Sequence, residues 1–294
     1  MRSRFAPDAR LIRRMLVTLA LLSVLYVAFA AALIALGVGA AIATAVVVAV
    51  LVVLHLAGDR MVVAAMGARE VSPAEAPELH AMLDRLCALA DLPKPRLAVS
   101  ESAEPNAFAA GHTSRRAVVC VTRGLLDRVD RRELEGVLAH ELSHVAHRDV
   151  ALGTIVSVFG VAAGLLWGMA VGLGLGPRRR FLIPLGLVVA AVAAVVHVIS
   201  LLLTRAFSRY RELAADRDGA LLTQQPSALA SALTKITEDL SARPAHALRG
   251  SHALNGAMFA PGLSGDRVNA LLSTHPPTAR RLEQLRWIST ELGT

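Results

Sequence analysis

The sequence predicts a mainly α-helical integral membrane protein, with two apolar helical hairpins and a folded helical domain that includes a small β-sheet. Composition predicts the membrane part, because 54% of the 294 residues are hydrophobic and only 18% are charged, which is too apolar for an ordinary soluble chain. Charge-free runs at residues 15–58, 150–177 and 181–204 predict the hairpins. Amphipathic spacing in the remaining segments predicts the folded domain.

The first charge-free run is long enough for two membrane spans. Its 44 residues would form about 66 Å of helix, and about 20 residues are enough to cross a bilayer. A break near 37–39 places the spans at about 15–36 and 38–57, so residues 1–58 are predicted to form a hairpin. Residues 28–30 (AFA) resemble a signal-peptidase site, but the apolar run continues past them, which favours an uncleaved hairpin.

Arginines flank this hairpin on both sides. Five lie among the first 14 residues, and Arg60 and Arg69 follow the run. Because positive charge favours the cytoplasmic side, both ends of the hairpin and the segment after it are predicted to be cytoplasmic.

The charge and the cysteine content exclude other classes of protein. The net charge is +8, but the arginines cluster beside apolar runs and only 4% of residues are aromatic, so we interpret the charge as membrane topology and expect no nucleic-acid binding. Cys87 and Cys120 are too few for a disulfide framework. Both are expected to be reduced structural thiols.

Residues 71–149 are predicted to form the first part of the folded domain. Apolar residues recur at helical spacing over 75–90, and the helix is expected to end at the breaker 92–95 (LPKP). Two short runs, 96–100 and 117–122, have the composition of β-strands.

Residues 150–204 are predicted to form the second apolar hairpin, which is expected to be membrane-embedded. Three arginines at 178–180 interrupt it, and a full crossing would place them outside, against the positive-inside tendency. The alternatives are a hairpin that dips into the bilayer, lies in its interface or packs on protein.

The second part of the domain is predicted at residues 205–294. A helix begins at Pro226, and a last helix follows 273–277 (STHPP). Residues 241–265, rich in Gly, Pro and Ala, are predicted to be a loop. One hypothesis is that this loop covers the functional site in a latent state.

A metal-site signature lies at residues 140–144 (HELSH). Asp130 and Glu133 form a capping-box pattern, and apolar spacing follows, so the segment is expected to be helical. Residues four apart share a helix face, so His140 and His144 can bind one zinc ion, with Glu141 beside them to accept a proton from water. The alternative is a surface helix that contains this pattern by chance. Zinc also needs a third protein ligand.

Glu212 and Asp216 repeat the four-residue spacing. One carboxylate can bind zinc while the other orients a ligand histidine. The alternative is a solvated helix face. If Glu212 joins the two histidines, the charge-free runs between them must cross the membrane an even number of times, and two such runs are present.

Several motifs together resemble one family over essentially the whole chain. They are the N-terminal hairpin, residues 106–108 (NAF), 140–144 (HELSH), the second hairpin, 208–216 (SRYRELAAD), 273–277 (STHPP) and Arg281. The chain resembles the HtpX-type membrane zinc metalloproteases, part of the broader gluzincin family that includes the CAAX prenyl endoproteases.

The resemblance implies a gluzincin-like zinc protease domain with one zinc ion per chain. His140, His144 and Glu212 would bind zinc, Glu141 would be the general base, and Asp216 would support a ligand histidine. The implied function is a zinc metalloendopeptidase in protein quality control and stress response. It would cleave misfolded proteins in or near the lipid bilayer, with its active site on the cytoplasmic face of a bacterial inner membrane.

Three further residues have both a functional and a structural interpretation. Asn106 lies on an edge strand in the family, where a substrate could add as a further strand, or it is a turn residue. His275 steadies the oxyanion, or it caps or packs. Arg209 pairs with Asp216, or it is a membrane-flanking cation. We expect no zinc ligation from the other nearby or loop histidines: His147, His246 and His252.

Two other functions compete with a protease at the membrane surface. An intramembrane-cleaving protease would place the metal motif in a span, but six flanking charges would be costly in lipid. A metal-binding scaffold would keep the ligands without chemistry, yet Glu141 would then have no role.

Overall fold

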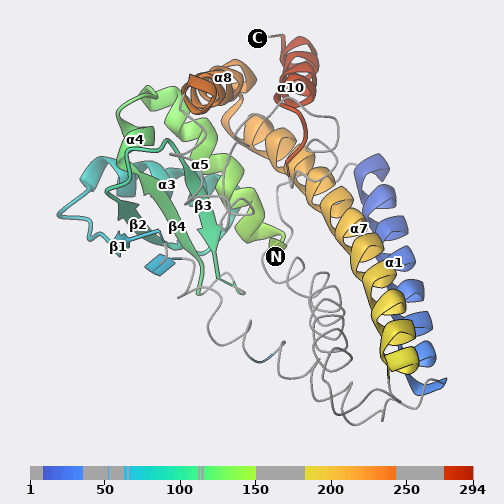
Figure 1. Cartoon of the computed structure of the whole chain (residues 1–294). Helices are drawn as coiled ribbons and strands as arrows, with labels where there is room; N and C mark the ends of the chain where they lie inside the picture. Colours follow the sequence, from blue (N-terminus) through green and yellow to red (C-terminus); the bar gives the residue numbers. More distant parts are fainter. Residues whose placement is uncertain are drawn as a thin grey trace. The chain divides into compact units, whose positions relative to one another are not determined.

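The computed structural model describes residues 9–35, 52, 63–64, 66–111, 113, 116–149, 183–242 and 275–293 (Figure 1). Several predicted features lie outside these residues. They are the break at 37–39, all but one residue of the span 38–57, residues 150–182 of the second hairpin and most of the predicted loop at 241–265.

The chain divides into two compact units. Unit 1 comprises Met1–Leu11, Gly58–Ala151 and Ser208–Thr294, and unit 2 comprises Ile12–Ala57 and Leu152–Phe207. All the residues of the predicted metal site belong to unit 1.

Unit 2 is described mainly by two helices, α1 (Ala9–Ala35) and the first part of α7 (Ile183–Thr223). They pack through Leu22, Tyr26 and Phe207, and the Tyr26 hydroxyl hydrogen-bonds Ser200 Oγ at 2.7 Å. In the part of the chain that the structure describes, one helical stretch is long and apolar enough to cross a membrane, judged by length and composition alone: Ala191–Thr223. One helix of each predicted hairpin is therefore described, and the hairpins themselves stay a prediction.

Unit 1 contains a four-stranded sheet. Its strands are β1 (Ala68–Glu70), β2 (Arg96–Ser100), β3 (Ala107–Ala110) and β4 (Val118–Thr122), in the order β1-β2-β4-β3. The central pair β2 and β4 is parallel, and both edge strands are antiparallel. The two predicted β-runs are this central pair.

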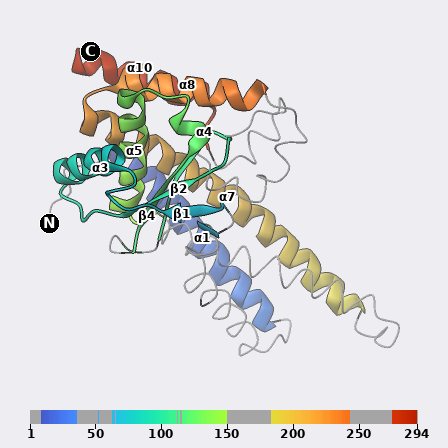
Figure 2. The ribbon, with the colours of Figure 1, turned by 90° about the vertical axis from the view of Figure 1, so that its left-hand side faces the viewer.

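Five helices complete the described part of unit 1 with the last turns of α7: α3 (Pro77–Ala90), α4 (Arg123–Leu126), α5 (Arg131–Ala146), α8 (Pro226–Ala242) and α10 (Thr278–Leu292). Helix α5 packs against strands β3 and β4, against α3 and against α8, and α8 packs against α10 (Figure 2). The helices predicted from residue 75, from Pro226 and after residue 277 are confirmed.

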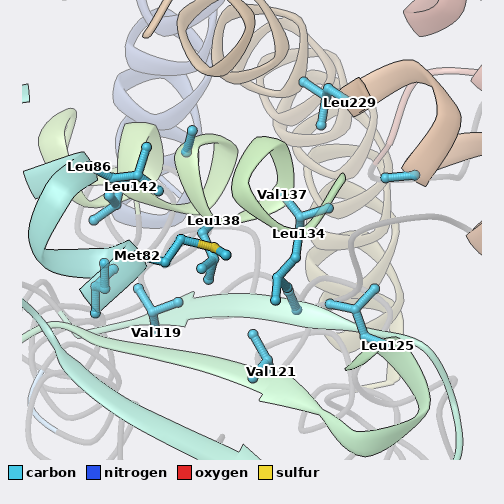
Figure 3. Packing of buried hydrophobic residues seen from close by; sticks show 14 of the residues in the cluster. Met82, Leu86, Val119, Val121, Leu125, Leu134, Val137, Leu138, Leu142 and Leu229 are labelled. Carbon is cyan, nitrogen blue, oxygen red and sulfur yellow. The ribbon is translucent and has the colours of Figure 1, made fainter. Parts of the chain in front are cut away.

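The main hydrophobic core lies between α5 and one face of the sheet. Figure 3 shows the α5 leucines and Val137 facing the strand residues Val119 and Val121 and the α3 residues Met82 and Leu86. This burial supplies the driving force that fixes α5, at about 1.5–3 kcal/mol for each large side chain. Both cysteines are free and buried, and burial raises the pKa of Cys87 to about 11 and that of Cys120 to about 12, which confirms them as structural thiols.

The N-terminus of α5 is fixed by the predicted capping box. Asp130 Oδ1 accepts hydrogen bonds from the backbone N–H groups of Arg132 and Glu133, and Glu133 Oε2 accepts one from the N–H of Asp130 at 2.7 Å. Glu133 also accepts hydrogen bonds from Ser231 Oγ at 2.6 Å and Lys235 Nζ at 2.7 Å on α8. One buried carboxylate therefore both caps α5 and holds α8 against it.

Glu133→Ala should lower the free energy of unfolding by about 2 kcal/mol, because it removes half of the capping box and two contacts to α8. Urea unfolding in detergent would measure the change. Glu238→Ala, which removes an exposed carboxylate from α8, is the matched control and should change stability little. Equal effects of the two substitutions would contradict the bridging role of Glu133.

Candidate metal centre

Helices α5 and α7 bring three ligand-type side chains together. One donor atom from each of His140, His144 and Glu212 lies within 4.8 Å of the other two. His144 Nε2 lies 3.2 Å from His140 Nε2 and 3.3 Å from Glu212 Oε1, and His140 Nε2 lies 3.6 Å from Glu212 Oε2. The four-residue spacing thus places both imidazoles on one face of α5, and α7 supplies the carboxylate.

Gly219 permits the close approach of α7 to α5. A Cβ atom at this position would lie 2.9 Å from the backbone nitrogen of His140, closer than real Cβ contacts allow. Gly219 lies on α7, seven positions after Glu212, and it meets α5 at the candidate ligand His140. A side chain at this position would push the two helices apart and would therefore move the carboxylate away from the imidazoles.

Two carboxylates define how the imidazoles are oriented. His140 Nδ1 lies 3.0 Å from Asp216 Oδ1, and His144 Nδ1 lies 2.7 Å from Asp149 Oδ2. An ionised carboxylate only accepts hydrogen bonds, so an imidazole that donates its Nδ1–H to one has its Nε2 lone pair free for a metal ion. This arrangement is typical of metal-ligating histidines.

The donor set fits a tetrahedral metal ion. Two ligands bonded at about 2.0–2.1 Å in tetrahedral geometry lie about 3.3 Å apart, close to the separations observed between the three side chains. Burial alone would lower the pKa of His140 and of His144, but hydrogen bonds to carboxylates outweigh it and raise both pKa values. Burial opposes ionisation of Glu212, yet the nearby histidines, beginning with His275, hold its pKa well below the usual range. The site therefore favours positive charge.

Arg281 of α10 holds Asp216 in place. Its Nε and Nη2 atoms donate to the two carboxylate oxygens at 2.7 and 2.6 Å, and both side chains are fully buried. Burial opposes ionisation of Asp216, but Arg281 outweighs it and lowers the pKa of this carboxyl. Oδ1 of Asp216 is shared between Arg281 and His140 Nδ1, and the pairing of Arg209 with Asp216 stays a prediction.

Comparison with known proteins identifies the family of this chain. Residues 73–289 match Peptidase family M48. The chain belongs to peptidase family M48. It is 51% identical to "Protease HtpX homolog 1" of Streptomyces coelicolor over 100% of this chain and 97% of that protein. It is 45% identical to "Protease HtpX homolog" of Moorella thermoacetica over 99% of both chains. The resemblance to HtpX-type proteases is confirmed, and the protein is a metalloprotease.

A solved structure shares the fold. The crystal structure of S. mikatae Ste24p superposes with a TM-score of 0.54 at 15% sequence identity. The match covers 95% of this chain and 66% of that one. At this identity the similarity concerns the fold alone.

In this M48 peptidase, Glu141 follows the candidate ligand His140 on α5 and is 3% exposed. Burial raises the pKa of Glu141, while the charges of His140 and His144 act in the opposite direction. A carboxylate with a raised pKa is a stronger base than an exposed one.

His275 and Asn106 occupy different parts of the M48 domain. His275 Nδ1 lies 2.8 Å from Glu212 Oε2, so this residue contacts the candidate ligand directly. Asn106 immediately precedes the edge strand β3 and is buried. Its backbone N–H donates to Thr122 Oγ1 at 2.9 Å, and its carbonyl accepts from the N–H of Thr122 at 3.0 Å, which ties the start of β3 to the end of β4.

His147 is the C-cap residue of α5 and contacts Ser143 and Asp218. Its Nδ1 lies 3.0 Å from the carbonyl oxygen of Ser143 and 3.6 Å from Asp218 Oδ2, and its side chain is 36% exposed. Among the described residues it is not part of the metal-type cluster. His246 and His252 lie outside the described residues.

Two contacts of the site were missed from the sequence. In the sequence, Asp149 is one of the six charges that flank the motif, and Arg281 is part of the family resemblance. The signal for Asp149 is its place five residues after His144, just beyond the end of α5, and Arg281 gives no local signal because its partner is 65 residues away.

Gly219→Ala should weaken Zn²⁺ binding roughly tenfold, because the added methyl group pushes α7 away from His140. Chelator competition in detergent would measure the affinity. Gly136→Ala is the matched control, since its Cβ would meet Leu229 of α8 at 3.2 Å, and it should cost stability but leave zinc affinity unchanged. Unchanged affinity in Gly219→Ala would show that this contact does not set the ligand spacing.

Proposed function

We propose that this M48 peptidase is a membrane-bound zinc endopeptidase that cleaves membrane or membrane-proximal proteins in protein quality control. The observation that carries the proposal is the convergence of His140, His144 and Glu212 beside the buried Glu141. Three protein ligands leave the fourth position of a tetrahedral zinc ion for water or substrate, as in catalytic zinc sites.

Glu141 would act as the general base and then as the general acid. Zinc, when bound, makes the attacking water acidic enough to lose a proton near neutral pH and polarises the scissile carbonyl. Glu141 accepts that proton, the water oxygen bonds to the carbonyl carbon, and the C–N bond breaks as Glu141 returns the proton to the departing amine. Its burial supports this role, because a raised pKa makes the carboxylate a stronger base for the first transfer.

Strand β3 offers a place for an extended substrate. It lies at the edge of the sheet and packs against α5, so a peptide could add beside it as a further strand. Asn106 at its start would contact this peptide. His275, which contacts Glu212, is the candidate for steadying the oxyanion, and Arg209 stays a membrane-flanking cation in this proposal.

The apolar helices support a place in a membrane. Large hydrophobic side chains on α1 and α7 are exposed, among them Leu16 at 60% and Val195 at 58%, which is the pattern of surfaces that face lipid. The arginine distribution supports a cytoplasmic active site in a bacterial inner membrane. Misfolded proteins of that membrane are then the substrates within reach.

The test measures zinc content and casein cleavage in detergent for wild type, Glu141→Gln, Glu212→Ala and the control His147→Ala. Wild type and Glu141→Gln should hold one zinc ion per chain. Cleavage should fall at least 1,000-fold in Glu141→Gln, roughly the contribution of a general base. Glu212→Ala should lose zinc and cleavage, and His147→Ala should keep both.

Other outcomes would contradict specific parts of the proposal. Full zinc content in Glu212→Ala would place the third ligand elsewhere. Full activity in Glu141→Gln would show that Glu141 is not the general base. Wild type that binds zinc but cleaves neither casein nor unfolded membrane proteins would support a metal-binding scaffold instead.

A further inference from the structure

The candidate metal centre contains two sets of contacts of the same kind, each made by a histidine, a carboxylate and an arginine. His140 contacts Asp216, which Arg281 holds, and His144 contacts Asp149, which Arg211 of α7 holds. We propose that Asp149 is a positioning residue for the ligand His144 and that Arg211 fixes Asp149 in that position. This inference rests on the proposed zinc site and assigns a second carboxylate to it.

The backbone at the end of α5 places Asp149 where it can reach His144. The helix ends at Ala146, and Arg148 then adopts a left-handed conformation with φ of 55°. Residues with a Cβ adopt this conformation rarely. This backbone conformation ends α5, and the side chain of Asp149 lies with Oδ2 2.7 Å from Nδ1 of His144.

Burial explains why Asp149 needs a cationic partner. The side chains of Asp149 and Arg211 are 12% and 10% exposed, so an unpaired carboxylate here would be costly. Arg211 makes a charge-assisted hydrogen bond and ion pair with Asp149. The pairing holds the carboxylate where its Oδ2 can accept a hydrogen bond from Nδ1 of His144, which leaves Nε2 of that ring as the metal donor.

The pair also joins two distant points of the chain. Asp149 is the last charged residue before the apolar run that begins at 150, and Arg211 lies directly before Glu212. One interaction across 62 residues therefore connects the segment after the HELSH motif to the helix that carries the third ligand.

The experiment compares Asp149→Ala and Asp149→Asn with the control Asp218→Asn. Asp218 is also a buried carboxylate close to α5, but it accepts its hydrogen bond from Ser143 Oγ at 3.1 Å and not from a ligand. Zn²⁺ affinity would be measured by chelator competition on the full chain in detergent. The visible spectrum of the Co²⁺-substituted protein would report ligand geometry.

Asp149→Ala should weaken Zn²⁺ binding 10–100-fold and change the Co²⁺ spectrum. Asp149→Asn should lose less affinity, because its amide oxygen can still accept a hydrogen bond from Nδ1–H of His144. Asp218→Asn should keep wild-type affinity. Arg211→Met should reproduce part of the loss, and adding it to Asp149→Ala should weaken binding no further, as expected for residues that act through one another.

Asp149→Ala with affinity within twofold of wild type and an unchanged Co²⁺ spectrum would overturn the inference. An equal loss in Asp218→Asn would do so too, since it would show a general effect of removing a buried carboxylate. If Asp149→Ala does not fold, Asp149→Asn and Arg211→Met decide by the same two measurements. Because the readout is metal binding, wild type that binds zinc without cleaving would refute the proposed function and leave this inference standing.

Discussion

The structure of unit 1 depends on one electrostatic constraint, the convergence of two imidazole lone pairs and a carboxylate in a buried site. Atoms that only accept hydrogen bonds repel one another at 3.2–3.6 Å unless a cation lies between them. Including Glu212, the site contains four carboxylates and two guanidinium groups: Glu141, Asp149, Glu212 and Asp216, with Arg211 and Arg281. With neutral histidines, these groups leave two negative charges, which a divalent cation would balance.

The cost of burying these charges explains the architecture around them. Each histidine-bound carboxylate has its own arginine, because a buried ion is tolerated only when paired and hydrogen-bonded. Arg281 comes from α10, so the C-terminal helix is anchored at the site. Glu133 solves the same problem at the other end of α5, where Lys235 of α8 supplies the cation. Charge pairing and core packing therefore fix α5 together.

Local sequence patterns predicted much of this fold and site, but they did not predict the contacts between residues far apart in the sequence. The capping residues Asp130 and Glu133 and the helical apolar spacing determine α5 locally, so the motif could be placed correctly. Strand β1 is three residues long with two charges, which gives no alternating pattern to detect. The partner of Asp216 could not be read from the sequence, because Arg209 is near it in sequence and Arg281 only in space.

The candidate ligands on α5 and α7 lie far apart in the sequence but close together in space. His140 and Glu212 lie 72 positions apart in the sequence, and most residues between them are apolar. The distance between their donor atoms must nevertheless be kept constant to within tenths of an ångström if both bind one metal ion. The entropy of closing a loop grows only by about 0.6 kcal/mol for each doubling of its length, so a long insertion between ligands is cheap. Such an insertion leaves the spacing of the ligands unchanged only if its two ends are held together. The Asp149–Arg211 pair joins these two points of the chain beside the candidate ligands, so the contact that positions His144 also holds the end of α5 to the ligand-bearing turn of α7.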